Sequence, residues 1–121
     1  LRRDSHKKLT ARLRWAIDNP NAKKVIEDYT RFGQEIPAGL VPPELHDIEW
    51  HLWSAFWELS TERQVGVNPG PIPGTAIRQY ADQEMGMSPS LFSQIIRAMD
   101  EVYLSHKSGE GKTFSRDMIK R

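Results

Sequence analysis

Residues 43–64 read PELHDIEWHLWSAFWELSTERQ and predict the most strongly apolar helix of the chain. Three tryptophans, Trp50, Trp53 and Trp57, form one stripe at helical spacing. A second stripe, displaced around the helix, consists of Leu45, Ile48, Leu52, Ala55, Phe56 and Leu59. Because apolar residues cover more than half of the circumference, we expect this helix to lie at the centre of the fold or to present one side to a partner.

Four further helices are predicted around this segment. The spacing of apolar residues places them over about 5–18, 20–32, 73–85 and 89–104. Asn19-Pro20 separates the first two, and glycines end the second and the fourth. Residues 65–74 (VGVNPGPIPG) hold three prolines and three glycines, too many for a helix interior. The predicted fold class is therefore all-α, a small bundle of about five helices with a Gly/Pro loop at 65–74 and flexible basic ends.

The same pattern predicts how the chain divides. Residues 1–33 form a basic helical hairpin at the N-terminus, and the proline-containing stretch 34–43 is a linker. Residues 44–104 form the core helical domain. Residues 105–121 are polar and rich in Gly, Ser and Lys, so we expect a disordered basic tail.

The formal net charge of +1 on 121 residues conceals an uneven distribution. Residues 1–17 carry six basic residues and one acidic residue, a net +5, and residues 105–121 carry five and two, a net +3. Residues 18–104 hold six basic and thirteen acidic residues, a net −7. An acidic middle with basic ends fits self-association, an acidic partner or a polyanion, and the plain alternative is a pair of solvated ends.

Composition excludes several classes of protein. The absence of cysteine rules out a disulfide scaffold, a thiolate zinc site and a cysteine nucleophile. No apolar run approaches the ~18 residues of a membrane-spanning helix, and the first residues lack the pattern of a signal peptide. We therefore expect a cytoplasmic protein without a membrane partner. The chain opens on Leu1, which indicates a fragment.

Candidate chemistry is sparse. His46 and His51 are five residues apart, a step that places their rings ~140° apart around a helix and does not suit a shared metal. Glu58 and Glu62 share a helix face, where solvation is the usual state of such a pair. The glycines of the loop lack the lysine of a phosphate-binding loop. We predict no catalytic, cofactor-binding or metal-binding residue, no cofactor, and a protein that is not an enzyme.

The tryptophan stripe is the strongest candidate for a binding surface. Tryptophan is over-represented at interface hot spots, and a partly exposed row on so small a domain needs a cover. We predict partner binding through Trp50, Trp53 and Trp57, together with Phe56 and Arg63. Core packing of a helix buried from both sides is the alternative.

Residues 75–99 also resemble a helix-turn-helix, in which the second helix enters the major groove of DNA. Two features count against it. The turn is one residue longer than usual, and the second helix is mainly apolar, with Asp100 and Glu101 directly after it. DNA binding is therefore the runner-up, and nucleic acid is not the expected partner.

The stretch from Trp53 to Leu104 resembles small proteins of tailed bacteriophages and prophages. The resemblance lies in the order of four pieces: LSTERQ (59–64), GPIP (70–73), the AI and YA of the following helix (76–81), and IRAMD with YL (96–104). Proteins of this kind resemble tail assembly chaperones. The resemblance implies a helical protein of the host cytoplasm that binds tail tube or tape-measure protein during virion assembly, and that leaves or persists in the virion. It implies no catalytic residue. A structural tail or head-completion subunit is the third reading.

Overall fold

The computed structural model describes residues 5–64, 66 and 69–110, with side chains from His6 to Ser105 within that range. These residues form five α-helices and two short turns, with no strand among them, which confirms the predicted all-α fold. The elements are α1 (Ser5–Asp18), α2 (Ala22–Arg31), the 3₁₀ turn η1 (Ala38–Leu40), α3 (Asp47–Ser60), α4 (Gly74–Tyr80), the π-helical turn η2 (Ala81–Met85) and α5 (Pro89–Glu110).

Helix α3 begins at Asp47, four residues later than the sequence predicts. The prolines at 42 and 43 restrict the preceding backbone, and His46 is the last residue before the helix. The backbone N–H of His46 donates to the carboxylate of Glu49 at 2.9 Å, which explains why Glu49 is buried although it is charged.

Glycines end two of the helices where the sequence predicts an end. Gly33 after α2 and Gly86 after η2 have φ angles of +66° and +60°, values that favour glycine. The helix predicted over 73–85 exists as two pieces, because its second half, Ala81–Met85, is the π-helical turn η2.

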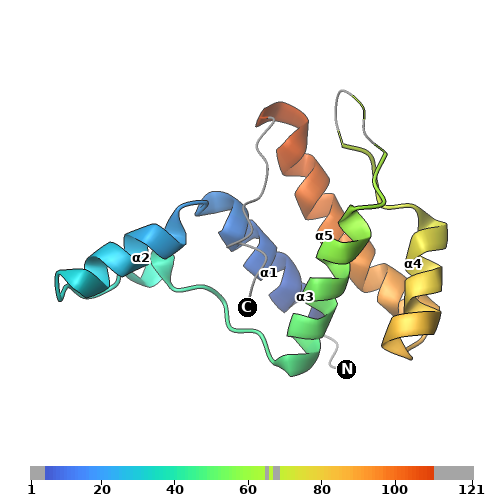
Figure 1. The fold of residues 1–121 in the computed structure, drawn as a ribbon, viewed down its shortest axis with the longest axis horizontal. Helices are drawn as coiled ribbons and strands as arrows, with labels where there is room; N and C mark the ends of the chain where they lie inside the picture. The colour runs from blue at the N-terminus through green and yellow to red at the C-terminus, as the bar shows by residue number, and fades with distance from the viewer. Residues whose placement is uncertain (1–4, 65, 67–68, 111–121) are drawn as a thin grey trace.

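Helix α5 lies at the centre of the bundle (Figure 1). It packs against α1, against α3 and against α4, which covers its N-terminal half. The buried core is contributed mainly by α1, α3 and α5, with Ile72 from the loop and Ile77 and Ala81 from the α4–η2 segment; its members are Leu9, Leu13, Ala16, Leu45, Leu52, Trp53, Ala55, Phe56, Leu59, Ile72, Ile77, Ala81, Phe92, Ile95, Ile96, Met99 and Val102.

Two predicted boundaries differ from the structure. Helix α1, assigned from sequence to a separate hairpin (1–33), shares the core of α3 and α5, because its narrow apolar stripe (Leu9, Leu13, Ala16) is buried there. Helix α5 continues to Glu110, so 105–110 are helical in place of the predicted disordered tail. Adding a further turn to a helix that is already formed costs little free energy, because each added residue gains a backbone hydrogen bond. Residues 1–4 and 111–121 lie outside the described residues, as do 65, 67 and 68 of the predicted loop.

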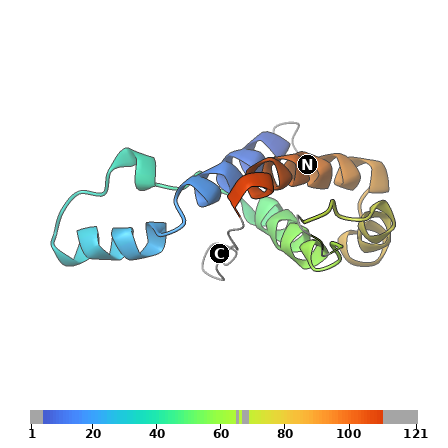
Figure 2. The same ribbon diagram turned by 90° about the horizontal axis from the view of Figure 1, so that it is seen from above.

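Helix α2 and the linker after it project away from the bundle. Figures 1 and 2 both show α2 extending beyond α1, on the side opposite to α4. No residue between 18 and 44 belongs to the core cluster. We call residues 19–44 the arm.

Trp53→Ala is expected to destabilise the fold by about 3–5 kcal/mol, because it removes a fully buried ring and leaves a cavity. Denaturant unfolding followed by circular dichroism measures the change. The control is Ser54→Ala, the next and exposed position of α3, for which we expect a change within ~0.5 kcal/mol. Equal midpoints for the two variants would contradict the central position of Trp53.

Candidate functional site

The predicted tryptophan stripe lies mostly inside the bundle. Trp53 has no exposed surface, and its ring meets those of Trp50 and Trp57 edge to face, with centroid distances of 6.4 and 5.8 Å. Trp50 and Trp57 are partly buried and pack against the core. Of the three rings, only these two have surface that a partner can touch without opening the bundle.

Phe56, also predicted to bind a partner, is fully buried. Its ring lies 5.2 Å from that of Trp57 and 6.1 Å from that of Tyr103 on α5, both edge to face. Trp57 and Tyr103 are themselves 6.0 Å apart. Such pairs stabilise by about 0.5–1.5 kcal/mol beyond their buried area, so these three rings fasten α3 to α5.

Arg12 of α1 covers the other end of the stripe. Its guanidinium carbon lies 5.0 Å from the ring centroid of Trp15 and 5.4 Å from that of Trp50, which is cation–π geometry. Burial lowers the pKa of Arg12 from its ordinary value. The indole N–H of Trp15 donates to the backbone oxygen of Gly39 at 3.1 Å. These contacts join α1, α3 and the turn η1 of the arm.

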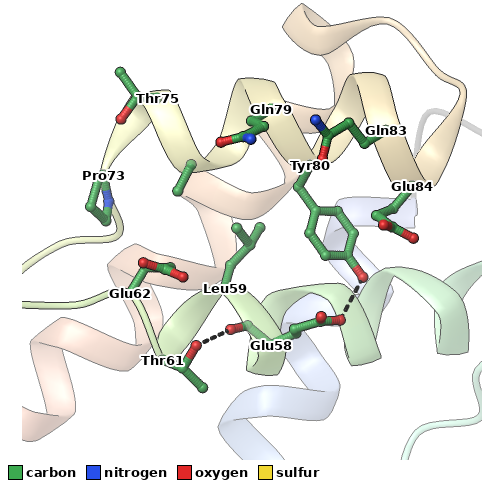
Figure 3. Close-up of a pocket in the computed structure, with 11 residues that line it drawn as sticks. Glu58, Leu59, Thr61, Glu62, Pro73, Thr75, Gln79, Tyr80, Gln83 and Glu84 are labelled. Atoms are coloured by element: carbon green, nitrogen blue, oxygen red, sulfur yellow. Dashed lines mark hydrogen bonds between the residues drawn. The ribbon is translucent and has the colours of Figure 1, made fainter.

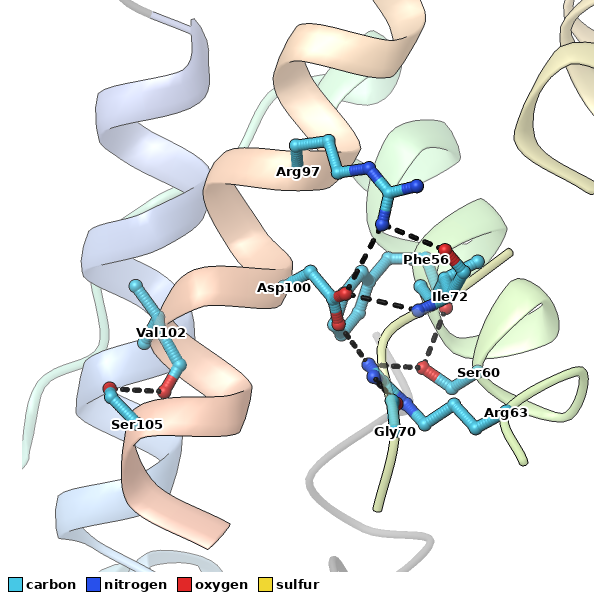
Figure 4. Close-up of polar contacts among 9 residues, drawn as sticks. All are labelled: Phe56, Ser60, Arg63, Gly70, Ile72, Arg97, Asp100, Val102 and Ser105. Atoms are coloured by element: carbon cyan, nitrogen blue, oxygen red, sulfur yellow. Dashed lines mark hydrogen bonds and ion pairs between the residues drawn. The ribbon is translucent and has the colours of Figure 1, made fainter. Parts of the chain in front are cut away.

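Arg63, the fifth predicted partner-binding residue, points into the protein (Figure 4). Its side chain is 6% exposed and forms an ion pair with Asp100 of α5, whose side chain is 3% exposed. Arg63 also donates to the backbone oxygen of Gly70 at 2.9 Å, and its guanidinium carbon lies 4.1 Å from the ring centroid of Tyr103. A buried guanidinium with these partners acts inside the fold, at the junction of α3, the loop and α5.

The same cluster holds the loop through Ile72, whose side chain is fully buried. The backbone N–H of Ile72 donates to the second oxygen of Asp100 at 3.1 Å, and its carbonyl accepts from Arg97 at 2.7 Å. Pro71 and Pro73 have no N–H, so Ile72 carries the one amide donor of this tripeptide. Arg97 lies 3.7 Å from Asp100 and completes the cluster. We call Arg63, Ile72, Arg97 and Asp100 the loop clamp.

Sequence reasoning did not find the loop clamp. It assigned Arg63 to a partner surface and treated Asp100 only as a charge that would repel DNA. One signal was present: Asp100 follows Ile96 by one helical turn, at the edge of a strongly apolar stripe. A carboxylate at that position must either be exposed or have a partner, and here it has Arg63.

Asp100→Asn is expected to cost about 3–5 kcal/mol of stability, because it leaves the charge of Arg63 buried without an opposite charge. The measurement is denaturant unfolding of Asp100→Asn, of Arg63→Met and of the double variant. The double variant should lose much less than the sum of the single losses, since the two groups act together. Additive losses would show that the two side chains are independent.

An open groove of about 480 Å³ lies between the C-terminal end of α3 and the α4–η2 segment (Figure 3). Three carboxylates, Glu58, Glu62 and Glu84, line it together with Tyr80. The hydroxyl of Tyr80 donates to Glu58 at 2.9 Å across the groove. The groove is acidic and largely polar, and its other lining residues are Leu59, Thr61, Pro73, Thr75, Ala76, Gln79 and Gln83.

Tyr80 is the titratable group that this groove perturbs most. Burial, the hydrogen bond to Glu58 and the charges of Glu58 and Glu84 together raise the pKa of Tyr80 to about 12. Its ring stacks on that of Phe92 at 5.8 Å, with an interplanar angle of 8°. The neutral phenol is therefore the form that the fold stabilises.

Because the folded-state pKa of Tyr80 is raised above its ordinary value of 10.0, its contribution to stability is present below pH ~10 and is lost as the pH rises toward 12. The ultraviolet absorbance of phenolate, compared between the wild type and Tyr80→Phe, isolates this titration. Glu58→Gln should lower the pKa of Tyr80. An unchanged value would contradict the contact.

His46 and His51, the two histidines considered as metal ligands in the sequence analysis, are both exposed. Within the described residues, no group of three or more His, Cys, Asp or Glu side chains is arranged to hold a metal ion.

The helix-turn-helix reading requires a free reading face at the start of α5. Arg97, the one basic residue between 89 and 105, donates to the loop carbonyl of Ile72. Phe92, Ile95 and Ile96 are buried in the core. Helix α5 is thus the central helix of the bundle, and its position does not favour insertion into DNA.

The loop clamp and the three aromatic residues Phe56, Trp57 and Tyr103 lie within a stretch of the chain that matches a known protein family. Residues 29–105 match the family described as phage tail assembly chaperone. The match spans the end of α2, the linker, and everything from α3 to the described side chains of α5. The chain therefore belongs to the phage tail assembly chaperone family.

No curated protein and no solved structure matches the chain. Among the described helices, none has both the length and the apolar character needed to cross a membrane.

Proposed function

We propose that this protein binds the tail tube protein or the tape-measure protein during assembly of the phage tail in the host cytoplasm. The single observation that carries the proposal is the family match over residues 29–105. The role is non-catalytic: the protein covers apolar surface of its client until assembly is complete.

The predicted partner-binding residues divide into two groups under this proposal. Trp50 and Trp57 contact the client, because each of these residues is partly exposed. Two of the others, Trp53 and Phe56, support that surface from inside because they are fully buried. Arg63 supports it as well, because its ion pair with Asp100 holds its side chain inside the fold.

The solvent side of α3 supports solubility of the complex. Asp47, His51, Ser54 and Glu58 are exposed there, and the residues between 18 and 104 carry a net −7. Like-charged complexes repel one another, which opposes aggregation while apolar client segments are being covered.

The double variant Trp50→Ala/Trp57→Ala should bind the client about 30-fold more weakly, the equivalent of ~2 kcal/mol for loss of an interface hot spot. The measurement is calorimetric titration with the tape-measure protein of the same phage, and separately with its tail tube protein. Circular dichroism checks that the variant is folded.

His51→Ala/Ser54→Ala, at exposed positions of the same helix, is the matched control and should bind as the wild type does. Wild-type affinity in a folded tryptophan variant would remove these residues from the interface. If neither tail protein binds the wild type, the proposed client is wrong. Persistence in purified virions would instead favour a structural subunit, and a salt-sensitive gel shift would favour DNA binding.

A further inference from the structure

The bundle holds a half-buried cation to which the described residues offer no opposite charge. The guanidinium carbon of Arg12 lies 5.0 Å from the ring centroid of Trp15 and 5.4 Å from that of Trp50. Its Nε is buried and has no hydrogen-bond partner in the described part of the chain. The ion pairs found there join other side chains, and none includes Arg12. Among the described residues, two indoles take the place that a carboxylate usually has beside a buried guanidinium.

A guanidinium in this environment is prepared to bind an anion. Burial lowers the pKa of Arg12 from its ordinary value, whereas a carboxylate nearby would act in the opposite direction, because it favours the charged form. The side chain stays protonated at neutral pH, as arginine does in proteins. Two indole faces have replaced part of its hydration, so an incoming carboxylate has less water to displace before it forms a charge-assisted hydrogen bond.

The side of α1 that carries Arg12 is basic. Lys8 precedes Arg12 by four residues and Trp15 follows it by three, so the three side chains share one face of the helix. All three are partly exposed. Asp18, the one acidic residue of α1, is displaced from Arg12 by ~120° around the helix. This face therefore presents two positive charges one turn apart, with an indole beside them.

Trp50 places this face at the edge of the proposed client surface. Helices α1 and α3 lie side by side, as Figures 1 and 2 show. Trp50 is one of the two partly exposed tryptophans that we propose to contact the client, and the guanidinium of Arg12 lies over its ring. Tryptophan and arginine are both enriched at interface hot spots. A client segment that covers Trp50 therefore comes within reach of Arg12. The residues of α1 precede the family match over 29–105, which assigns them no role.

We propose that Lys8, Arg12, Trp15 and Trp50 form a subsite for acidic side chains of the client, in which Arg12 binds a carboxylate of aspartate or glutamate. This inference rests on the proposed function, since it names the chemistry of the client segment that lies over Trp50. Lys8 and Arg12 are about 6 Å apart along the axis of α1, the rise of four residues. A client helix with two carboxylates four residues apart matches that spacing, and an apolar residue on the same face covers the indoles.

Nuclear magnetic resonance with two synthetic peptides tests the subsite in the full chain. The first is an alanine-based helical peptide with glutamates four residues apart and one leucine on the same face, and the second has glutamine at the glutamate positions. We expect the glutamate peptide to shift the indole N–H signals of Trp15 and Trp50 and to leave that of the fully buried Trp53 in place. The glutamine peptide should bind about tenfold more weakly, because it cannot form the charge-assisted hydrogen bond. Equal affinity for the two peptides would overturn the proposal.

Two matched variants locate the charge that binds the peptide. Arg12→Gln should raise the dissociation constant for the glutamate peptide about tenfold. Arg14→Gln removes the same charge from an exposed position on the opposite side of α1 and should change that constant less than about twofold. Circular dichroism shows whether each variant is folded. If Arg12→Gln does not fold, Lys8→Gln takes its place, with an expected loss of about threefold. Equal losses in the Arg12 and Arg14 variants would show that only the overall charge of the helix matters, which contradicts a subsite.

Other occupants of this face give other results. Duplex DNA that shifts the same indole signals at lower concentration than the glutamate peptide would assign the face to a phosphate backbone. Signals that shift with the concentration of the protein alone would assign it to a second copy. Either result overturns the proposal.

Client titration with Arg12→Gln separates this inference from the proposed function. If the wild type and Arg12→Gln bind the client equally, the subsite is wrong and the proposed function stands. If the wild type binds neither tail protein, the proposed function is wrong, and the peptide titration still decides the chemistry of the subsite.

Discussion

The buried ion pair between Arg63 and Asp100 is the interaction on which the arrangement of the helices depends. It lies where three parts of the chain meet: the end of α3, the Gly/Pro loop and the middle of α5. Burying two charges is costly, and the cost is offset only when their remaining hydrogen-bonding groups are satisfied. Here the backbone oxygen of Gly70 accepts from Arg63 and the backbone N–H of Ile72 donates to Asp100, while Nε of Arg63 is buried with no hydrogen-bond partner among the described residues. The ion pair therefore constrains the path of the loop, because few other backbone paths would bring Gly70 and Ile72 to the two charged groups.

The two charges also explain why a loop with so many prolines is ordered at Ile72. Proline removes donors from the backbone, and the loop has few hydrogen bonds of its own, such as the one from the N–H of Gly70 to the oxygen of Gln64 at 3.3 Å. Helix α5 supplies what is missing, since Asp100 accepts from the amide and Arg97 donates to the carbonyl of the same residue. The side chain of Ile72 then fills the core between α3 and α5. The family match over residues 29–105 covers all of these residues, whereas most of α2 precedes the match.

Much of the fold could be predicted from the sequence, and the reason is local. Five helices follow from apolar spacing, and their ends from Gly33, Gly86 and Asn19-Pro20, because those signals act over one or two turns. The site could not be predicted in the same way. Whether Trp53 faces a partner or the core depends on α5 and α1, which are distant in sequence. Arg63 and Asp100 are 37 positions apart, so no local pattern pairs them. The resemblance to phage proteins identified the family because it depends on the order of short motifs and needs no contact map.

The most direct test of the clamp is the exchange rate of the Ile72 amide hydrogen, measured by NMR in deuterated solvent. Our account predicts slow exchange at Ile72, comparable with buried amides of α5, although Ile72 belongs to no helix and lies between two prolines. The donor is buried against the Asp100 carboxylate, and exchange requires the clamp to open. Exchange as fast as that of an exposed loop amide would contradict the account, because it would mean that Arg63, Arg97 and Asp100 do not hold the loop.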